Sequence, residues 1–430
     1  MQVHLTTLGC RLNEAELENW ASGFMSKGHA ITQTPEQADV VVINTCAVTQ
    51  EAVRKSRQLI RRTHRNNPAA KLVVSGCYSS LNKTLADEVE GIDLMVPNQD
   101  KEKLVEITMQ ELNMLAMPSE ATTPGETSLF KRGRQRAFIK IQDGCRYHCT
   151  YCIVTVARGN ERSRTIKDIV TEINQLTSQG IREAVLTGVH VGGYGSDIQT
   201  NLYELINAIL GETDLPRLRL ASVEPWDLPD KFFELFSNPR LMPHMHLPLQ
   251  SGSDSVLKRM SRRCKTADFK HLIDYARNKV QDFNVTTDVI VGFPGETESE
   301  WQDSMEFIRS AEFSHIHIFS YSERGGTKAA ELPDQVNKHV KKMRSVQLHQ
   351  LAAEMKKAYL KKHISREFSI LWEGSTKMEN TGITRYFGYT PNFIRTQIDI
   401  NSNEILTNKI QQTKITSVNP NGENVLSIKI

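Results

Sequence analysis

The 430-residue sequence contains no long hydrophobic run and no strong excess of charge of either sign. No stretch approaches the roughly 18 apolar residues that a membrane-spanning helix needs. The residues before Cys10 hold neither the basic start nor the apolar stretch of about 7–15 residues that a secretory signal needs. We therefore expect a cytoplasmic protein. The net charge of +3 does not by itself indicate nucleic-acid binding, so any basic surface must be local.

The chain also lacks a disulfide framework of the secreted type, because its cysteine count is odd and the chain is long. In a reducing compartment, clustered cysteines are more often metal ligands or catalytic groups. The sequence contains no internal repeat or low-complexity tract, and 39% of its residues are hydrophobic, as in globular proteins with real cores. Its length predicts two or three domains. The seven cysteines are Cys10, Cys46, Cys77, Cys145, Cys149, Cys152 and Cys264.

The first 115 residues alternate strand-like and helix-like runs, which predicts a parallel sheet covered by helices. Cys10, Cys46 and Cys77 each follow directly after a strand-like run. Ligands of open α/β sheets bind at the carboxyl ends of the strands, so these three cysteines can meet at one edge of the sheet. The expected strands are VHLTTLG, ADVVVINTC, KLVVSGC and IDLMVPN.

Beyond this region, a segment rich in Pro, Thr, Ser and Glu predicts a linker, and six further strand–helix units then predict a partial or complete parallel barrel. A basic, helix-favouring stretch follows. The last part of the chain alternates short strand-like runs with turns, which is typical of a small all-β barrel. We therefore predict an α/β protein with an N-terminal domain at 1–115, a linker at 116–130, a central core at 131–364 and a β domain at 365–430.

The segment from Asp143 to Cys152 carries the clearest chemical signal. Cys145, Cys149 and Cys152 are spaced so that one loop can hold three irons of a [4Fe–4S] cluster, which leaves the fourth iron without a protein ligand. A zinc site is the alternative, with His148 as a fourth ligand. Structural zinc sites use four protein ligands, however, and usually pair them across two intervening residues. The spacing therefore favours the cluster.

This Cys-x3-Cys-x2-Cys spacing, with Tyr151 before the last cysteine, resembles the radical S-adenosylmethionine (SAM) superfamily. The resemblance implies that the open iron binds the methionine part of SAM and that SAM is cleaved to a 5′-deoxyadenosyl radical. Other segments resemble the superfamily in their order behind the loop. They imply SAM contacts by the backbone at Thr187 and Gly188, by Glu224 and by Val291 before Gly-Phe-Pro-Gly-Glu. The resemblance of the cysteine loop implies a further SAM contact by Tyr151. Each of these segments on its own is also a common strand end or turn of α/β proteins.

The segments around Cys10, Cys46 and Cys77 resemble the N-terminal domain of radical SAM methylthiotransferases. Three separate buried cysteines are the alternative reading. The resemblance implies a second [4Fe–4S] cluster with an open iron that binds the sulfur to be inserted. It also implies two SAM molecules per turnover, catalytic roles for Cys145, Cys149, Cys152 and Gln250, and a place for Gln250 between the clusters and in SAM binding. An unactivated aromatic C–H position requires this kind of cofactor chemistry.

Three substrates are known in this family: tRNA with isopentenyladenosine, tRNA with threonylcarbamoyladenosine and an aspartate of a ribosomal protein. The segment Thr-Leu-Gly-Cys-Arg-Leu-Asn around Cys10 is most similar to the threonylcarbamoyladenosine enzymes, which act at position 37 of tRNA. The isopentenyl enzymes more often carry Tyr-Gly-Cys-Gln-Met-Asn, and the ribosomal-protein enzymes Leu-Gly-Cys-Pro-Lys-Asn. We therefore predict methylthiolation of threonylcarbamoyladenosine, with the other two substrates as alternatives.

Local basic segments favour RNA as the macromolecular partner, although charged runs are more often simply solvated. The β segment resembles the RNA-binding TRAM barrel, with Arg385, Tyr386, Phe387 and Arg395 able to contact RNA or, for the aromatics, to fill the core. The basic residues are Arg54, Lys55, Arg57, Arg61, Arg62 and Arg65, then Lys338, Lys341, Lys342, Arg344, Lys356, Lys357, Lys361 and Lys362.

Two features fall outside the resemblance. The segment 322–327 departs from the Pro-rich segment that relatives carry there, and Cys264 matches no cluster motif, so we interpret it as a packing or surface thiol. The sequence identifies neither the sulfur donor nor the electron donor. Nothing in it requires more than a monomer.

Overall fold

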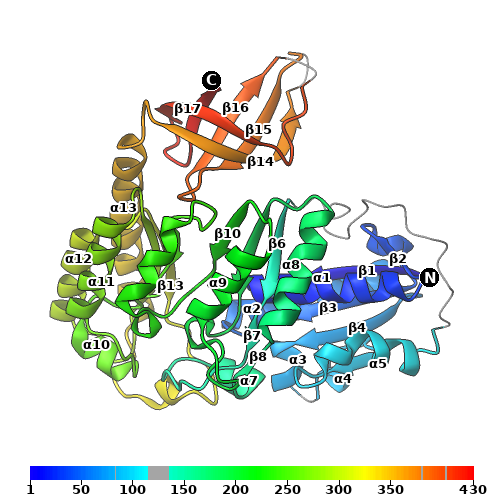
Figure 1. The fold of residues 1–430 in the computed structure, drawn as a ribbon. Helices are drawn as coiled ribbons and strands as arrows, with labels where there is room; N and C mark the ends of the chain where they lie inside the picture. The colour runs from blue at the N-terminus through cyan, green and yellow to red at the C-terminus, as the bar shows by residue number, and fades with distance from the viewer. Residues whose placement is uncertain (83, 115–134, 379–380, 402–403) are drawn as a thin grey trace.

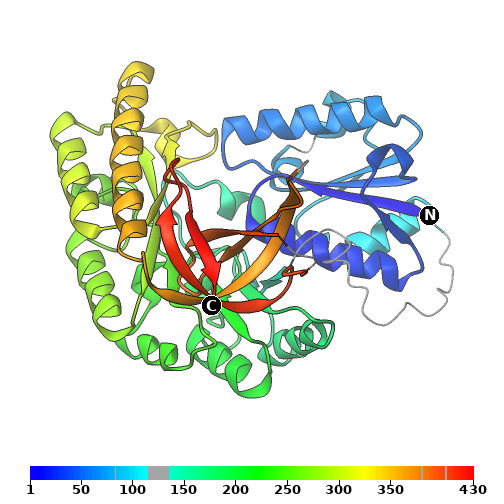
Figure 2. The ribbon, with the colours of Figure 1, turned by 90° about the horizontal axis from the view of Figure 1, so that it is seen from above.

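The computed structural model describes residues 1–82, 84–114, 135–378, 381–401 and 404–430. The predicted linker at 116–130 lies outside these residues, and the predicted domain boundaries stay predictions. Among the described residues, no helix is long and apolar enough to cross a bilayer. Two α/β regions lie side by side, and a small β barrel sits above the junction between them (Figures 1 and 2).

The N-terminal region is a parallel sheet in the order β2-β1-β3-β4-β5. In β3, Val41 and Ile43 pack in one apolar cluster with Ile60 of α2, whereas Val40 and Val42 pack in a second cluster. Both faces of the central strand are therefore buried, which explains its unbroken apolar run. The elements are β1 (Gln2–Thr7), α1 (Arg11–Ser26), β2 (Ala30–Thr32), η1 (Pro35–Gln37), β3 (Val40–Thr45), α2 (Gln50–Asn66), β4 (Lys71–Gly76), α3 (Cys77–Leu81), α4 (Leu85–Glu88), β5 (Leu94–Val96), η2 (Lys101–Lys103) and α5 (Leu104–Glu111).

The central region is a partial (β/α) barrel, as predicted. Two parallel three-stranded sheets, β10-β9-β6 and β11-β12-β13, are joined by isolated bridges between Leu218 and Leu241 and between Ser222 and His246. Its strands and main helices are β6 (Arg136–Lys140), α8 (Ile166–Ser178), β9 (Glu183–Thr187), α9 (Leu202–Glu212), β10 (Arg217–Leu220), β11 (His244–His246), α10 (Asp254–Arg259), α11 (Thr266–Lys279), β12 (Asn284–Val291), α12 (Glu298–Ala311), β13 (His315–Ser320) and α13 (Lys338–Lys361).

Short elements complete the connections of the central region. A two-stranded pair of β7 and β8 encloses the cysteine loop, and α7 follows that loop. These elements are β7 (Gln142–Asp143), α7 (Val154–Arg158), β8 (Arg162–Ser163), η3 (Val191–Gly193), η4 (Pro225–Asp227), η5 (Asp230–Ser237) and η6 (Lys328–Glu331).

The C-terminal region is a closed five-stranded barrel in the order β14-β15-β16-β18-β17, as predicted for a TRAM-like domain. Trp372, Ile398 and Ile415 belong to its core. The barrel covers the amino ends of the central strands, because Arg136 at the start of β6 pairs with Glu373, and Arg217 at the start of β10 donates to the Tyr389 carbonyl. Its strands are β14 (Glu367–Lys377), β15 (Thr384–Tyr389), β16 (Arg395–Ile400), β17 (Ile410–Val418) and β18 (Val425–Lys429).

Candidate active site

The structure brings Cys10, Cys46 and Cys77 together at the carboxyl edge of the N-terminal sheet. They follow β1, β3 and β4, which are neighbours in that sheet. Gly9 has φ +119°, and a Cβ there would lie 3.0 Å from Cys46 Sγ, so glycine is what allows these two loops to come close. Burial, with a smaller contribution from the neighbouring thiols, raises the pKa of Cys46 to about 11. Three thiols that meet at one edge of the sheet suit iron–sulfur ligation.

Cys145, Cys149 and Cys152 form a second group of half-buried thiols within one loop. The amide of Cys152 donates to the Cys149 carbonyl at 3.0 Å, and that of Cys145 to the Gly159 carbonyl at 3.1 Å. Burial is the main cause that raises the pKa of Cys145 to about 12 and of Cys152 to about 11, and nearby thiols add to it. Cluster ligation requires these thiols to lose their protons.

A zinc site with four protein ligands is not formed around this loop by the residues that the structure describes. His148 is exposed, and the histidine that lies near Cys145 is His190. Both ring nitrogens of His190 are occupied, Nδ1 by Glu161 at 2.5 Å and Nε2 by Asp227 at 2.6 Å. Burial opposes protonation of His190, but these two contacts outweigh it and raise its pKa. The donor set therefore fits a cluster with one open iron better than closed zinc.

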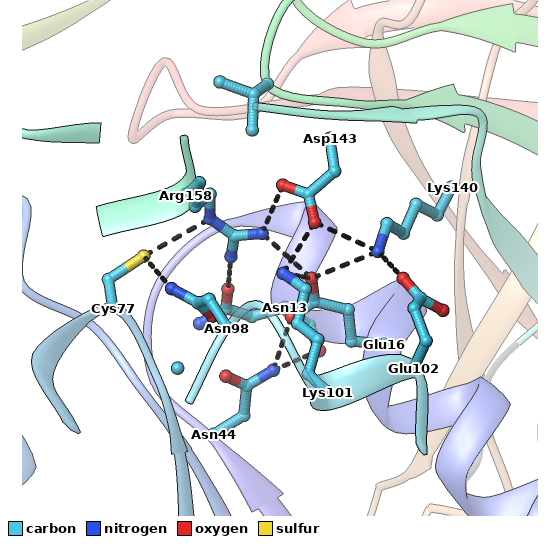
Figure 3. Close-up of polar contacts among 12 residues, drawn as sticks. Asn13, Glu16, Asn44, Cys77, Asn98, Lys101, Glu102, Lys140, Asp143 and Arg158 are labelled. Carbon is cyan, nitrogen blue, oxygen red and sulfur yellow. Dashed lines mark hydrogen bonds and ion pairs between the residues drawn. The ribbon is translucent and has the colours of Figure 1, made fainter. Parts of the chain in front are cut away.

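Arg158 of α7 connects the two cysteine groups through a buried polar network (Figure 3). Its Nε donates to Cys77 Sγ at 3.3 Å and its Nη2 to Asn13 Oδ1 at 2.8 Å. Its Nη1 donates to Glu16 at 2.9 Å and to Asp143, two residues before Cys145, at 3.0 Å. One side chain thus contacts a cysteine of the first group and the start of the loop that carries the second.

Lysines complete this network from a different side (Figure 3). Lys101 lies 2.5 Å from Glu16 and 2.7 Å from Asp143, and Lys140 lies 3.1 Å from Asp143 and also pairs with Glu102. Burial alone would raise the pKa of Glu16, but the surrounding cations outweigh it and hold that pKa at about 2. They also hold the pKa of Asp143 well below its usual range. The negative and positive charges of this network therefore balance each other.

Glu224, one of the predicted SAM contacts, is held beside the central cysteine loop. Arg262 Nη2 donates to Glu224 at 2.8 Å and to the Pro248 carbonyl at 2.6 Å, and its guanidinium lies 4.4 Å from the Trp226 ring centroid. Nη1 of the same arginine is 4.0 Å from Cys149 Sγ. Arg262 therefore fixes the Glu224 carboxylate close to the loop.

Of the other predicted contacts, Thr187 and Val291 end β9 and β12, Gly188 and Gln250 lie beyond strand ends, and Tyr151 lies in the cysteine loop itself. Gln250 has φ +75°, an unfavourable conformation that is common at functional sites, and exchanges backbone hydrogen bonds with β12. Thr187 and Gly188 line a cavity. Tyr151 packs against the apolar cluster of Phe293. Val291 is fully buried.

That cavity of about 560 Å³ runs through the interior of the partial barrel and is lined by all three regions of the chain. Cys10 and Arg11 come from the N-terminal region, and Thr187 and Gly188 lie at the carboxyl end of β9. At the end next to the C-terminal barrel, Tyr389 and Phe393 stack with ring centroids 4.7 Å apart. The cavity thus reaches from a cysteine of the first group to the β barrel.

The other face of Phe393 stacks on His244, again with centroids 4.7 Å apart. The backbone of Phe393 is left-handed, with φ +67°. Thr390 stabilises this turn, because its Oγ1 accepts the Ile394 amide at 2.8 Å. The ring is thereby held in place as part of the cavity wall.

Sequence reasoning did not single out Arg158, Arg262 or His190 as parts of the site. Arg158 lies only six residues beyond Cys152, but its partners Glu16 and Asn13 are far away in the sequence. Two other predicted contacts are corrected by the structure. Arg344 is buried and paired with Glu296 at 2.9 Å, and Tyr386 belongs to the core of the C-terminal barrel, so neither is available to RNA.

The remaining basic residues of α2 include five exposed side chains. On α13, Lys356 pairs with Glu423, while others are exposed. Arg385 pairs with Asp399 on the barrel surface at 2.7 Å. Cys264 is half-buried against the main core, as expected for a packing thiol. The exposed members of α2 are Arg54, Lys55, Arg61, Arg62 and Arg65, and those of α13 are Lys338, Lys342, Lys357 and Lys361.

Solved structures share this fold. The radical S-adenosylmethionine methyltransferase TsrM from Kitasatospora setae superposes with a TM-score of 0.59 at 14% identity, over 76% of this chain and 77% of that chain. The cobalamin-dependent S-adenosylmethionine radical enzyme OxsB superposes with a TM-score of 0.52 at 11% identity, over 82% of this chain and 61% of that chain. At these identities the likeness concerns the fold alone.

Sequence relatives extend over almost the whole chain. Residues 139–308 match the radical SAM superfamily, and residues 2–97 match the Uncharacterized protein family UPF0004. The threonylcarbamoyladenosine tRNA methylthiotransferase MtaB of Bacillus subtilis is 35% identical over 95% of this chain and 92% of its own length. MtaB of Thermotoga maritima is 35% identical over 86% of each chain.

A relative that is named for a different substrate is also similar. The tRNA-2-methylthio-N(6)-dimethylallyladenosine synthase of Staphylococcus haemolyticus is 32% identical over 89% of this chain and 77% of its own length. Both kinds of relative are tRNA methylthiotransferases of the radical SAM type, and enzymes of this type use [4Fe–4S] clusters and SAM. This chain therefore belongs to the radical SAM methylthiotransferase family and is an enzyme.

Proposed function

We propose that this chain adds a methylthio group to carbon 2 of N6-threonylcarbamoyladenosine at position 37 of tRNA. The cavity carries this proposal, because Cys10, the carboxyl end of β9 and the C-terminal barrel all line it. A nucleobase in that cavity lies next to a cysteine of the first group while the rest of the RNA remains outside. The names of the two MtaB relatives support this substrate.

Two sets of thiolates would hold the two [4Fe–4S] clusters. We assign Cys145, Cys149 and Cys152 to the cluster that binds SAM, and Cys10, Cys46 and Cys77 to the cluster that carries sulfur. When bound, these groups supply the one-electron and sulfur chemistry that side chains lack. Three thiols in each set, with no fourth cysteine beside either among the described residues, match a cluster with one open iron.

The residues of the chain position and shield these groups. Arg158 places a buried positive charge beside Cys77 and fixes Asp143 at the start of the central loop. Charge-assisted hydrogen bonds of this kind orient metal ligands from outside the ligand shell. We further assign Glu224, oriented by Arg262, to the SAM ribose, and Tyr151, Thr187, Gly188, Gln250 and Val291 to the remaining SAM contacts.

The RNA would lie along exposed basic residues. The exposed cations of α2, together with the rim residue Arg395, are suited to phosphate contacts. Phe387, with the Arg395 guanidinium 5.3 Å from its ring centroid, is a candidate stacking platform on the barrel. These groups position the tRNA and contribute no sequence reading of their own.

We also propose that the enzyme works as a monomer in the cytoplasm. The three regions of one chain complete the cavity, so a partner copy is not required for the site. A reducing compartment keeps six ligand thiols available, and tRNA is the expected macromolecular partner. The predicted domains at 1–115, 131–364 and 365–430 correspond to one role each: sulfur-carrying cluster, SAM chemistry and RNA contact.

Mass spectrometry of tRNA nucleosides from a strain lacking this gene, with and without the restored gene, tests the proposal. We expect loss and return of 2-methylthio-threonylcarbamoyladenosine, with the isopentenyl counterpart unchanged. Loss of the isopentenyl derivative instead would retain the chemistry and overturn the substrate. If neither nucleoside changed, the proposal would fail, and the aspartate of a ribosomal protein would be the next substrate to examine.

A further inference from the structure

Arg11 is the first residue of α1, directly after Cys10, and its side chain lines the cavity. The guanidinium lies 5.8 Å from the ring centroids of both Phe138 and Phe393. Phe138 belongs to β6 of the central region, and Phe393 to the wall contributed by the C-terminal barrel. A cation is thus held between aromatic rings at the meeting point of three regions.

The other three arginines near this point each have an acidic partner. Arg136 pairs with Glu373 at 2.7 Å, and Arg219 pairs with Glu183 at 3.1 Å. The third, Arg217, lies 3.7 Å from the same Glu183 carboxylate. Glu183 is buried and Glu373 is half-buried, and both of these acids already have arginine partners.

Arg11 differs from these arginines. Among the described residues it has no ion pair or hydrogen bond, while Arg136 and Arg219 repel it. Burial is the larger cause, and together they lower the pKa of Arg11 to about 10, so the side chain stays charged near neutral pH. An unneutralised, half-buried cation that faces a cavity is suited to an anionic ligand.

Three of the four histidines that line the cavity, His244, His315 and His317, have lowered pKa values and do not supply another positive charge near neutral pH. The fourth, His246, lies 3.1 Å from Asp288. Burial lowers the pKa of His244 well below its usual range and that of His315 to about 4. Lys356 pairs with Glu423, and Arg395 lies at the exposed rim, where it suits an RNA phosphate. Arg11 is therefore the free charge inside the cavity, within the part of the chain that the structure describes.

We propose that Arg11 binds the carboxylate of the threonylcarbamoyl group and thereby selects this nucleotide over adenosines with a neutral N6 substituent. This inference rests on the proposed function. Carbon 2 and carbon 6 of adenine flank the same ring nitrogen, so a substituent on N6 can fold along the edge that carries carbon 2. When carbon 2 faces the first cysteine group, the end of that substituent therefore lies beside the residue that follows Cys10.

The aromatic lining of the cavity next to the C-terminal barrel agrees with this placement. Tyr389 and Phe393 close that end with aromatic surface, which can pack against the methyl group of the threonyl side chain. A guanidinium can grip a carboxylate with two parallel hydrogen bonds, which an isopentenyl group cannot accept. A neutral substituent would leave Arg11 without a partner in a half-buried site, and unpaired buried polar groups give strong discrimination.

The test uses reconstituted holoenzyme and three anticodon stem-loops. They carry threonylcarbamoyladenosine, its methyl ester or isopentenyladenosine at position 37. Binding is measured by fluorescence anisotropy, and 2-methylthio product by mass spectrometry. We expect the wild-type enzyme to prefer the acid over the ester by about tenfold to a hundredfold in both Kd and kcat/KM, the range for a hydrogen-bonded charge.

Arg11→Gln should lose the preference and not simply the activity. We expect it to bind acid and ester equally within about twofold, whereas Arg11→Lys, which keeps the charge, retains part of the preference. Arg309→Gln is the matched control, because Arg309 is an exposed arginine of α12 and does not line the cavity. It should behave as the wild type. Circular dichroism and iron content verify that each variant is folded and loaded.

The outcomes separate this inference from the proposed function. A wild-type enzyme that makes no product from the acid stem-loop counts against the proposed function. Product formation with equal preference for acid and ester overturns the role of Arg11 alone, and this comparison needs no variant to fold. Retention of the full acid preference by Arg11→Gln also overturns it.

Discussion

The two cysteine groups of this molecule are assembled in opposite ways. Cys145, Cys149 and Cys152 come from one loop, so the local chain alone brings them together. Cys10, Cys46 and Cys77 come from the ends of three parallel strands, and they meet only when the sheet has formed. Arg158, from the central region, then contacts this sheet-edge group at Cys77.

The two cysteine groups therefore depend on different parts of the fold. A loop-borne group tolerates disturbance elsewhere, since its ligands are held by neighbours in sequence. A group at a sheet edge depends on the packing of the whole region and on the interface that supplies Arg158. Four changes test the contrast, from the largest expected effect to the smallest.

Cys149→Ala should abolish SAM cleavage completely, because the central cluster would lose one of its three ligands. Iron content should fall from about eight to about four per chain, since the sheet-edge group is built independently. Formation of 5′-deoxyadenosine, measured by chromatography, reports the loss. Cys264→Ala is the matched control and should keep both iron and activity, since Cys264 packs against the main core. Residual SAM cleavage by Cys149→Ala would contradict the assignment.

Cys46→Ala should separate the two chemistries. We expect SAM cleavage to persist while the methylthio product disappears, because only the sheet-edge cluster is lost. The two products are measured in the same reaction, 5′-deoxyadenosine by chromatography and modified nucleoside by mass spectrometry. A Cys46→Ala enzyme that still forms methylthio product would show that this group does not carry the sulfur.

Arg158→Met should weaken the interface between the two regions. Removing one partner from a buried charge network costs about 3–5 kcal/mol, because Glu16 and Asp143 then lose one of the three cations that they share and keep Lys101 and Lys140. Urea unfolding monitored by circular dichroism measures the change. Arg162→Met is the control, since Arg162 is exposed and lies 3.7 Å from the same Asp143 carboxylate. We expect it to cost less than about 1 kcal/mol. Equal effects of the two substitutions would refute a special role for Arg158.

Glu183 lies away from both cysteine groups. It therefore provides a reference for how acid changes the stability of the protein. Burial alone would raise its pKa, but Arg219, Arg136 and Arg217 hold it at about 2, below the ordinary 4.5. Because the folded pKa is depressed, the stabilisation is complete well above pH 4.5 and is lost as the pH falls towards 2. By pH 4 about 1 kcal/mol should be gone.

Urea unfolding at pH 6 and pH 4 measures this loss in the wild type and in Glu183→Gln. The variant is less stable at pH 6 and should lose less on acidification, since its side chain does not titrate. An equal decline in both proteins would place the acid sensitivity elsewhere, with the network of Glu16 and Asp143 as the next candidate.

The sequence predicts the layers of this fold well, because periodicity reports which faces are buried. The apolar run at 40–43 indicated a strand covered on both sides, and its cysteine marked the edge of the sheet. Periodicity does not report which element covers a face. Arg344 therefore looked like one more cation in a basic run, although it is buried and pairs with Glu296 and Glu298. Arg158 was missed for the same reason, since its partners Asn13, Glu16 and Cys77 come from the N-terminal region.

The turn that presents Phe393 has a consequence for how this protein can be improved. A left-handed backbone at a bulky residue costs on the order of 1 kcal/mol or more, and asparagine or glycine would relieve it. A library selected only for heat resistance should therefore drift away from phenylalanine at this position. Such clones would endure heating longer and would have lost the aromatic wall of the cavity. Directed evolution of this enzyme needs turnover in the selection from the first round.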